Sequence, residues 1–223
     1  MINPGQLFED VDISITWHPG IFNGIALQSN NALNSVFFKF YGKTAHAAAD
    51  PYNGRSALDA VELMNVGANY MREHMIPDAR IHYVITNGGL APNVVPEEAE
   101  VHYFVRAPER SQVDELYNRL INIAKGAVLM TETRLEVDFI SGTYNPVRND
   151  VVNNVIFEKM KQVGPPKFSK EEQNFAEELK KTVPPPDFTE MKKIVPPDLW
   201  ERAMNNLKKP LFLTIAPLSE KAQ

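Results

Sequence analysis

Between residues 33 and 142 the spacing of apolar residues switches between two and about 3.6, and this alternation constrains the fold more than any other feature. Spacing of two predicts strands at 35–41, 80–86, 98–106 and 134–140. Helical spacing predicts helices at 56–75 and 111–131. The expected order of elements is therefore β-α-β-β-α-β.

This order is that of a ferredoxin-like α+β domain, in which two helices cover one face of a four-stranded antiparallel sheet. The other face and the edge strands are left for another element or another copy to cover. We place this domain at residues 31–143.

The segments on either side have a different character. In residues 1–30, the alternating run from Val11 to Trp17 predicts a strand that ends at a His18-Pro-Gly turn. In residues 144–223, Asn149 or Asp150 can cap a helix that ends at Gly164. A capping-box pattern at Ser169 then predicts a helix over 170–181, and the remainder is rich in proline.

Composition excludes several classes of protein. The net charge is -5, which disfavours broad binding to nucleic acid or anionic membranes. The chain has no cysteine, so disulfides and thiolate metal sites are excluded. No apolar run is long enough to span a membrane, and the N-terminus lacks a signal-peptide pattern, so we expect a cytoplasmic protein.

Four residues are candidates for a functional site. His46 lies on a polar connection between a predicted strand and a predicted helix, where functional side chains concentrate. Asn93 lies between two prolines, and Arg106 ends a strand on its non-core face; both can bind a carboxylate or oxyanion. His18 follows a strand end, where a ligand or an acid–base group fits. Local sequence alone is equally compatible with a solvated His46.

Three short blocks in this domain resemble one known family. They are Gly42-Lys-Thr-Ala-His46-Ala-Ala-Ala-Asp-Pro51, Gly88-Gly-Leu-Ala-Pro-Asn93-Val-Val-Pro96 and Val105-Arg106-Ala107. In this order they resemble the lid, or dimerisation, domain of the zinc amidohydrolases and metallopeptidases, which include aminoacylases, acetylornithine deacetylase and glutamate carboxypeptidase. One extra residue separates His46 from Pro51. Trp17-His18-Pro19 and Phe168-Ser-Lys-Glu-Glu-Gln-Asn-Phe-Ala176 are similar to the branch typified by p-aminobenzoyl-glutamate hydrolase.

The resemblance implies a role for each candidate. His46 would be catalytic, reaching from the lid of one subunit into the partner's active site to bond the oxyanion or a carboxylate. Asn93 and Arg106 would bind the substrate's carboxylate, and His18 would be a metal ligand. The implied reaction is hydrolysis of an amide bond to an amino acid, glutamate above all, by water activated on zinc or another divalent metal such as manganese. The implied partner is a second copy, through the lid.

The chain departs from the family in its metal site. No glutamate pair precedes His18, and no histidine follows His102. One imidazole cannot hold a two-metal site. We therefore expect a fragment, a lid flanked by partial α/β catalytic-domain segments, that does not bind metal tightly and is inactive by itself. The alternative is a non-enzymatic ferredoxin-like module for dimerisation or small-ligand binding.

Overall fold

The computed structural model describes residues 10–17, 24–25, 30–147, 149–184, 187 and 189. Residues 30–146 form one compact unit, and helices α4 (Asp150–Val163) and α5 (Lys170–Lys180) belong to a second one. Among the described helices, none combines the length and the apolar character needed to cross a membrane.

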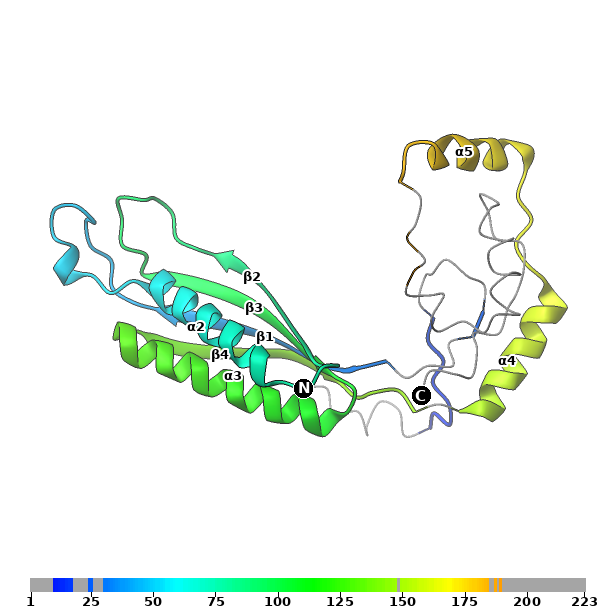
Figure 1. Ribbon diagram of the computed structural model, residues 1–223, viewed down its shortest axis with the longest axis horizontal. Coiled ribbons are helices and arrows are strands. Elements are labelled where there is room, and N and C mark those ends of the chain that lie inside the picture. Colours follow the sequence, from blue (N-terminus) through cyan, green and yellow to red (C-terminus); the bar gives the residue numbers. More distant parts are fainter. Residues whose placement is uncertain are drawn as a thin grey trace. The chain divides into compact units, whose positions relative to one another are not determined.

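The first unit has the expected element order. It contains β1 (Ala32–Tyr41), α2 (Ala57–Met71), β2 (Arg80–Asn87), β3 (Glu98–Ala107), α3 (Arg110–Thr131) and β4 (Arg134–Thr143), with short 3-10 turns η1 (Pro51–Asn53) and η2 (Arg72–His74). The strands form one antiparallel sheet in the order β2-β3-β1-β4. Figure 1 shows α2 and α3 on the same side of this sheet. The predicted ferredoxin-like α+β fold is confirmed.

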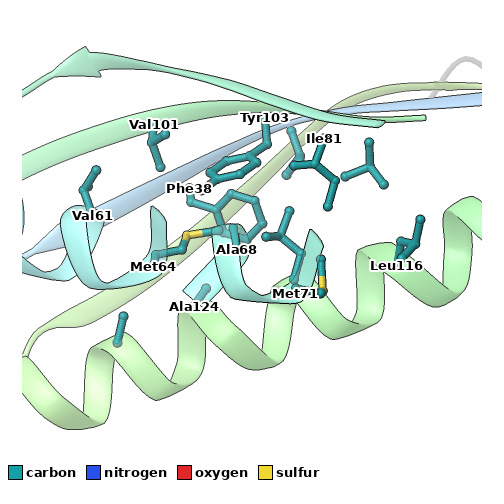
Figure 2. Close-up of a cluster of buried hydrophobic side chains, with 14 of the residues drawn as sticks. Phe38, Val61, Met64, Ala68, Met71, Ile81, Val101, Tyr103, Leu116 and Ala124 are labelled. Atoms are coloured by element: carbon teal, nitrogen blue, oxygen red, sulfur yellow. The ribbon is translucent and has the colours of Figure 1, made fainter. Parts of the chain in front are cut away.

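The core lies between the sheet and the two helices. Phe38 and Phe40 of β1 are fully buried against Met64 of α2 and Leu120 of α3. Figure 2 shows these helices presenting small and flexible side chains to the larger residues of the sheet. The alternation predicted for the strands therefore directs one side of each strand into the core.

One buried polar pair crosses this core. The hydroxyl of Tyr103 on β3 donates to Oδ1 of Asn65 on α2 at 2.5 Å, and both residues are buried. Buried polar groups persist when they are paired in this way. The bond ties the first helix to the central part of the sheet.

The opposite face of the sheet is open and partly aromatic. The Phe37 and His102 rings stack with centroids 4.0 Å apart, and Phe104 meets His102 edge-on. His102 Nε2 is 2.9 Å from the hydroxyl oxygen of Ser35. Charged residues continue the face along β1, where Lys39 Nζ lies 3.2 Å from a carboxylate oxygen of Asp138.

Arg110 joins the two strands through which the chain enters and leaves this unit. Its guanidinium donates to the carbonyl oxygens of Leu33 on β1 (3.3 Å) and Thr143 on β4 (3.4 Å). It also donates to Oδ1 of the buried Asn34 at 2.7 Å. Asp114, one turn along α3, pairs with the same side chain. This end of the sheet is therefore closed by one cation.

In the second unit, Asn149 and Ser169 cap α4 and α5 as predicted, through bonds from the backbone N–H groups of Val152 and Glu172. The strand predicted over Val11–Trp17 is wrong, since residues 10–17 contain no strand. The alternating apolar side chains there are exposed, Trp17 to 84%. Alternation favours a strand only where a neighbouring strand completes the ladder, and the described residues supply none.

Candidate functional site

His46 lies in a loop (residues 42–56) that is braced by its own backbone. Lys43 and Arg55 exchange two backbone hydrogen bonds of 2.8 Å each, which close the loop at its base. Gly42 has no room for a side chain there, because a Cβ would lie 1.9 Å from the carbonyl oxygen of Arg55. Arg55 also pairs with Glu132, just beyond α3, with Nε 2.9 Å from the carboxylate. The His46 loop is thus fixed to the body of the domain.

A second loop (residues 88–97), which carries Asn93, lies against the first. The N–H of Ala47 donates to the carbonyl oxygen of Asn93 at 2.9 Å, and the N–H of Val95 donates to that of Ala45 at 2.9 Å. Figure 1 shows the two loops beyond the same end of the sheet. Although far apart in sequence, His46 and Asn93 therefore occupy one backbone scaffold.

The imidazole of His46 is oriented by the turn that follows it. Nδ1 accepts from the backbone N–H groups of Ala48 (3.2 Å) and Ala49 (3.1 Å). The carboxylate of Asp50 accepts from the backbone N–H of His46 at 3.2 Å, and the N–H of Asp50 donates to the carbonyl of His46 at 3.0 Å. The residue is exposed, so the remaining ring nitrogen, Nε2, is accessible.

Asn93 carries a side chain that is open to an external ligand. The residue is exposed, and within the described part of the chain its side-chain amide makes no hydrogen bond. Its backbone is committed to the contact with Ala47. An amide of this kind has two N–H donors available for an external oxygen atom.

Arg106 lies elsewhere. It pairs with Leu33 at the start of β1, whereas Tyr41, the last residue before the His46 loop, pairs with Glu98. The eight-residue step along β3 from Glu98 to Arg106 corresponds to about 26 Å. The guanidinium is exposed, with its carbon atom 5.4 Å from the centre of the Phe104 ring. One chain therefore does not bring Arg106 together with His46 and Asn93.

His18, the predicted metal ligand, lies outside the described residues. Within the described residues, no group of three or more His, Asp or Glu side chains is arranged to hold a metal ion. The residues in hand therefore do not fit a zinc or manganese site.

Asp50, Arg55 and Arg110 were not among the residues singled out from the sequence. Asp50 precedes a proline and follows three alanines, so it carries no motif of its own. Its position four residues after His46 was the available signal, because an aspartate can accept from a nearby backbone N–H and so stabilise a turn.

Comparison with known proteins gives this arrangement a family context. Residues 29–132 match the model of a peptidase dimerisation domain. Over 184 residues the chain is 43% identical to a p-aminobenzoyl-glutamate hydrolase of Escherichia coli, covering 82% of this chain and 38% of that protein. It is 32% identical to the Xaa-Arg dipeptidase of Mus musculus, covering 70% of this chain and 36% of that protein. The chain thus spans less than two fifths of the length of these curated relatives.

Solved structures agree in fold. An aminobenzoyl-glutamate utilization protein from Klebsiella pneumoniae superposes with a TM-score of 0.50 and 22% identity, over 60% of this chain and 34% of that one. A hydantoinase/carbamoylase family amidase from Burkholderia vietnamiensis gives a TM-score of 0.53 and 14% identity, over 61% of this chain and 33% of that one. At these identities the likeness establishes the fold alone.

Proposed function

Because residues 29–132 are a peptidase dimerisation domain, the chain belongs to the amidohydrolase and peptidase family that carries this domain, and we propose that it forms the lid of a longer enzyme that hydrolyses an amide bond to an amino acid. The observation that carries the proposal is the pairing of His46 and Asn93 on one braced scaffold. Glutamate is the amino acid we favour, since the relative of 43% identity is named for a glutamate amide.

The proposed role of the two side chains is to donate hydrogen bonds to negatively charged oxygen. Hydrolysis of an amide passes through a tetrahedral intermediate with an oxyanion, and donors held in advance stabilise it. His46 offers Nε2, and Asn93 offers its amide. The backbone bonds between the two loops hold both donors without cost at the moment of reaction.

The position of Arg106 supports action as a homodimer. A carboxylate bound by Arg106 lies about 26 Å along β3 from the His46 end of the same chain, which exceeds the length of an amino-acid amide. His46 and Asn93 of one copy and Arg106 of another can serve one substrate. Two lids therefore supply two complementary half-sites.

A surface suited to the second copy is present on α2 and the edge strand β2. Its exposed apolar residues are Leu63, Val66 and Tyr70 of α2 and Tyr83, Val84 and Ile85 of β2. We call it the α2–β2 surface. In the described sheet β2 is an outer strand that can add a strand from another copy, and the apolar residues gain from burial. A role in dimerisation without catalysis is the second candidate function, and this surface favours it.

Metal belongs to the proposal for the longer enzyme only. Activation of water by zinc or manganese is what such a metal supplies. The described residues do not fit such a site, so we expect the isolated chain to bind no metal tightly and to hydrolyse no amide. A cytoplasmic location remains a prediction from the sequence.

A lid exchange tests the function. Residues 30–146 would replace the corresponding lid of the Escherichia coli relative, in a preparation that hydrolyses p-aminobenzoyl-glutamate. We expect the chimera to retain hydrolysis. His46→Ala or Asn93→Ala within it is expected to lower kcat by about 10²–10³-fold, the usual cost of one oxyanion donor.

Replacement of His82, an exposed residue on β2, by Ala is the matched control and is expected to leave kcat unchanged. A folded, dimeric chimera whose activity is indifferent to both His46 and Asn93 would contradict the proposal. So would amide hydrolysis by the 223-residue chain alone.

A further inference from the structure

The turn after His46 restricts which nitrogen of the imidazole can carry the proton. A backbone N–H can only donate, and two of them, from Ala48 and Ala49, point at Nδ1. Nδ1 must therefore present a lone pair. A neutral imidazole has one N–H, so the proton is on Nε2.

We propose that residues 47–50 act as a positioning device that holds His46 as a donor through Nε2 and bars it from acting as a general base or a metal ligand at that nitrogen. Both of the barred roles need a lone pair on Nε2, which exists only in the tautomer that carries hydrogen on Nδ1. That hydrogen would face two N–H groups. The assignment of the acceptor, an oxyanion or carboxylate oxygen, rests on the proposed function; the assignment of the tautomer does not.

Asp50 is the positioning residue of this device. Its backbone N–H closes the turn onto the carbonyl of His46, and one carboxylate oxygen accepts from the backbone N–H of His46. The other oxygen lies 3.5 Å from the side-chain nitrogen of Asn53. These contacts keep the turn tight enough for the amides of Ala48 and Ala49 to reach the ring of His46.

The extra residue between His46 and Pro51 is part of the same geometry. The segment from His46 to Asp50 is closed by an i→i+4 hydrogen bond, which requires all three intervening alanines. Alanine leaves the ring room to fold back over its own turn. The ring and the turn thus cap one another.

The test is nuclear magnetic resonance of the full chain with ¹⁵N-labelled histidine, at a pH of about 8.5, where an ordinary histidine is neutral. Long-range ¹H–¹⁵N correlations distinguish a nitrogen that bears hydrogen from one that does not. We expect His46, identified by loss of its signals in His46→Gln, to show an unprotonated Nδ1 and a protonated Nε2, without tautomer averaging.

His74 is the internal reference, because it is exposed and its ring makes no hydrogen bond within the described residues. Its two nitrogens are expected at averaged positions. Asp50→Ala should move the His46 nitrogens towards the averaged positions of His74 while the amide spectrum of the sheet stays unchanged. Asp78→Ala, which removes an exposed aspartate of another turn, should leave them in place.

Averaged nitrogens for His46 in the unmodified chain, or a proton on Nδ1, would overturn the proposal. So would an unchanged His46 in Asp50→Ala. None of these outcomes bears on hydrolysis by the lid-exchange chimera, so failure of this inference and failure of the proposed function are read out separately.

Discussion

Gly42 lies so close to Arg55 that a Cβ built on the glycine would stand 1.9 Å from the carbonyl oxygen of Arg55. Backbone atoms form this contact on both sides, so no side chain can turn away to relieve it. We expect Gly42→Ala to separate the two strands at the base of the His46 loop. The expected loss in the free energy of unfolding is about 1–3 kcal/mol, the usual cost of overpacking, as measured by urea denaturation.

Gly126 provides the matched control, because it lies within α3 and a Cβ there would meet no atom within 4 Å. Gly126→Ala is expected to stabilise the domain by about 0.5–1 kcal/mol through helix propensity. Equal effects of the two substitutions would contradict the close contact at Gly42.

Tyr103 makes stability sensitive to alkaline pH. Burial raises the pKa of its phenol far above the ordinary value of about 10, which the unfolded chain retains. Above that pH the unfolded state loses a proton that the folded state keeps, so the free energy of unfolding falls as pH rises. The slope approaches about 1.4 kcal/mol per pH unit for this residue. Denaturation series between pH values of about 8 and 11 would measure it.

Tyr103→Phe removes this source of the slope at a cost. It leaves Oδ1 of Asn65 buried without its donor, which costs about 1–3 kcal/mol at neutral pH. Tyr52→Phe, at an exposed position, should change neither quantity. An alkaline slope that survives unchanged in Tyr103→Phe would show that another group is responsible.

The α2–β2 surface predicts how the chain associates. Val66→Glu with Ile85→Lys places charges on two of its exposed apolar positions, and we expect Kd of the homodimer to rise by about tenfold or more. Sedimentation velocity across a dilution series measures the change. Leu129→Glu on α3, equally apolar and exposed, is expected to leave the dimer intact. Dissociation by Leu129→Glu alone would place the interface elsewhere.

Arg110 is expected to control the stability of the end of the sheet where the chain enters and leaves. Arg110→Lys keeps the charge but cannot reach Leu33, Asn34 and Thr143 together, because an ammonium lacks the planar fork. The expected loss is about 1–3 kcal/mol, since Oδ1 of the buried Asn34 loses its partner. Hydrogen exchange should quicken at the start of β1 and the end of β4. Arg134→Lys, an exposed residue of β4, is the control.

The sequence predicted the fold of residues 30–146 well because each element there pairs a local preference with one buried face. Strand ends moved by up to three residues, since β1 begins at Ala32 and β4 ends at Thr143. The same alternation misled at Val11–Trp17, where no neighbouring strand is described. A pattern records which side of a segment is apolar and is silent about whether a partner exists to bury it.

The site was predicted less completely. Sequence spacing brought forward His46, Asn93 and Arg106 as one set, and only the first two share a scaffold in a single chain. The direction of β3 separates the third, and direction is a property of topology that no local motif encodes. The contacts of Asp50 and Arg55 involve the backbone, which every residue type carries, so composition gave no warning of them.

The distance between Arg106 and the His46 loop has a consequence for how activity scales with the amount of protein. If each site needs a guanidinium from one copy and an imidazole from another, every active site is a product of association. Specific activity of the longer enzyme should then fall on dilution through the dimer Kd. Mixing a His46 variant with an Arg106 variant should restore one working site in each mixed dimer, a quarter of the wild-type sites at statistical exchange.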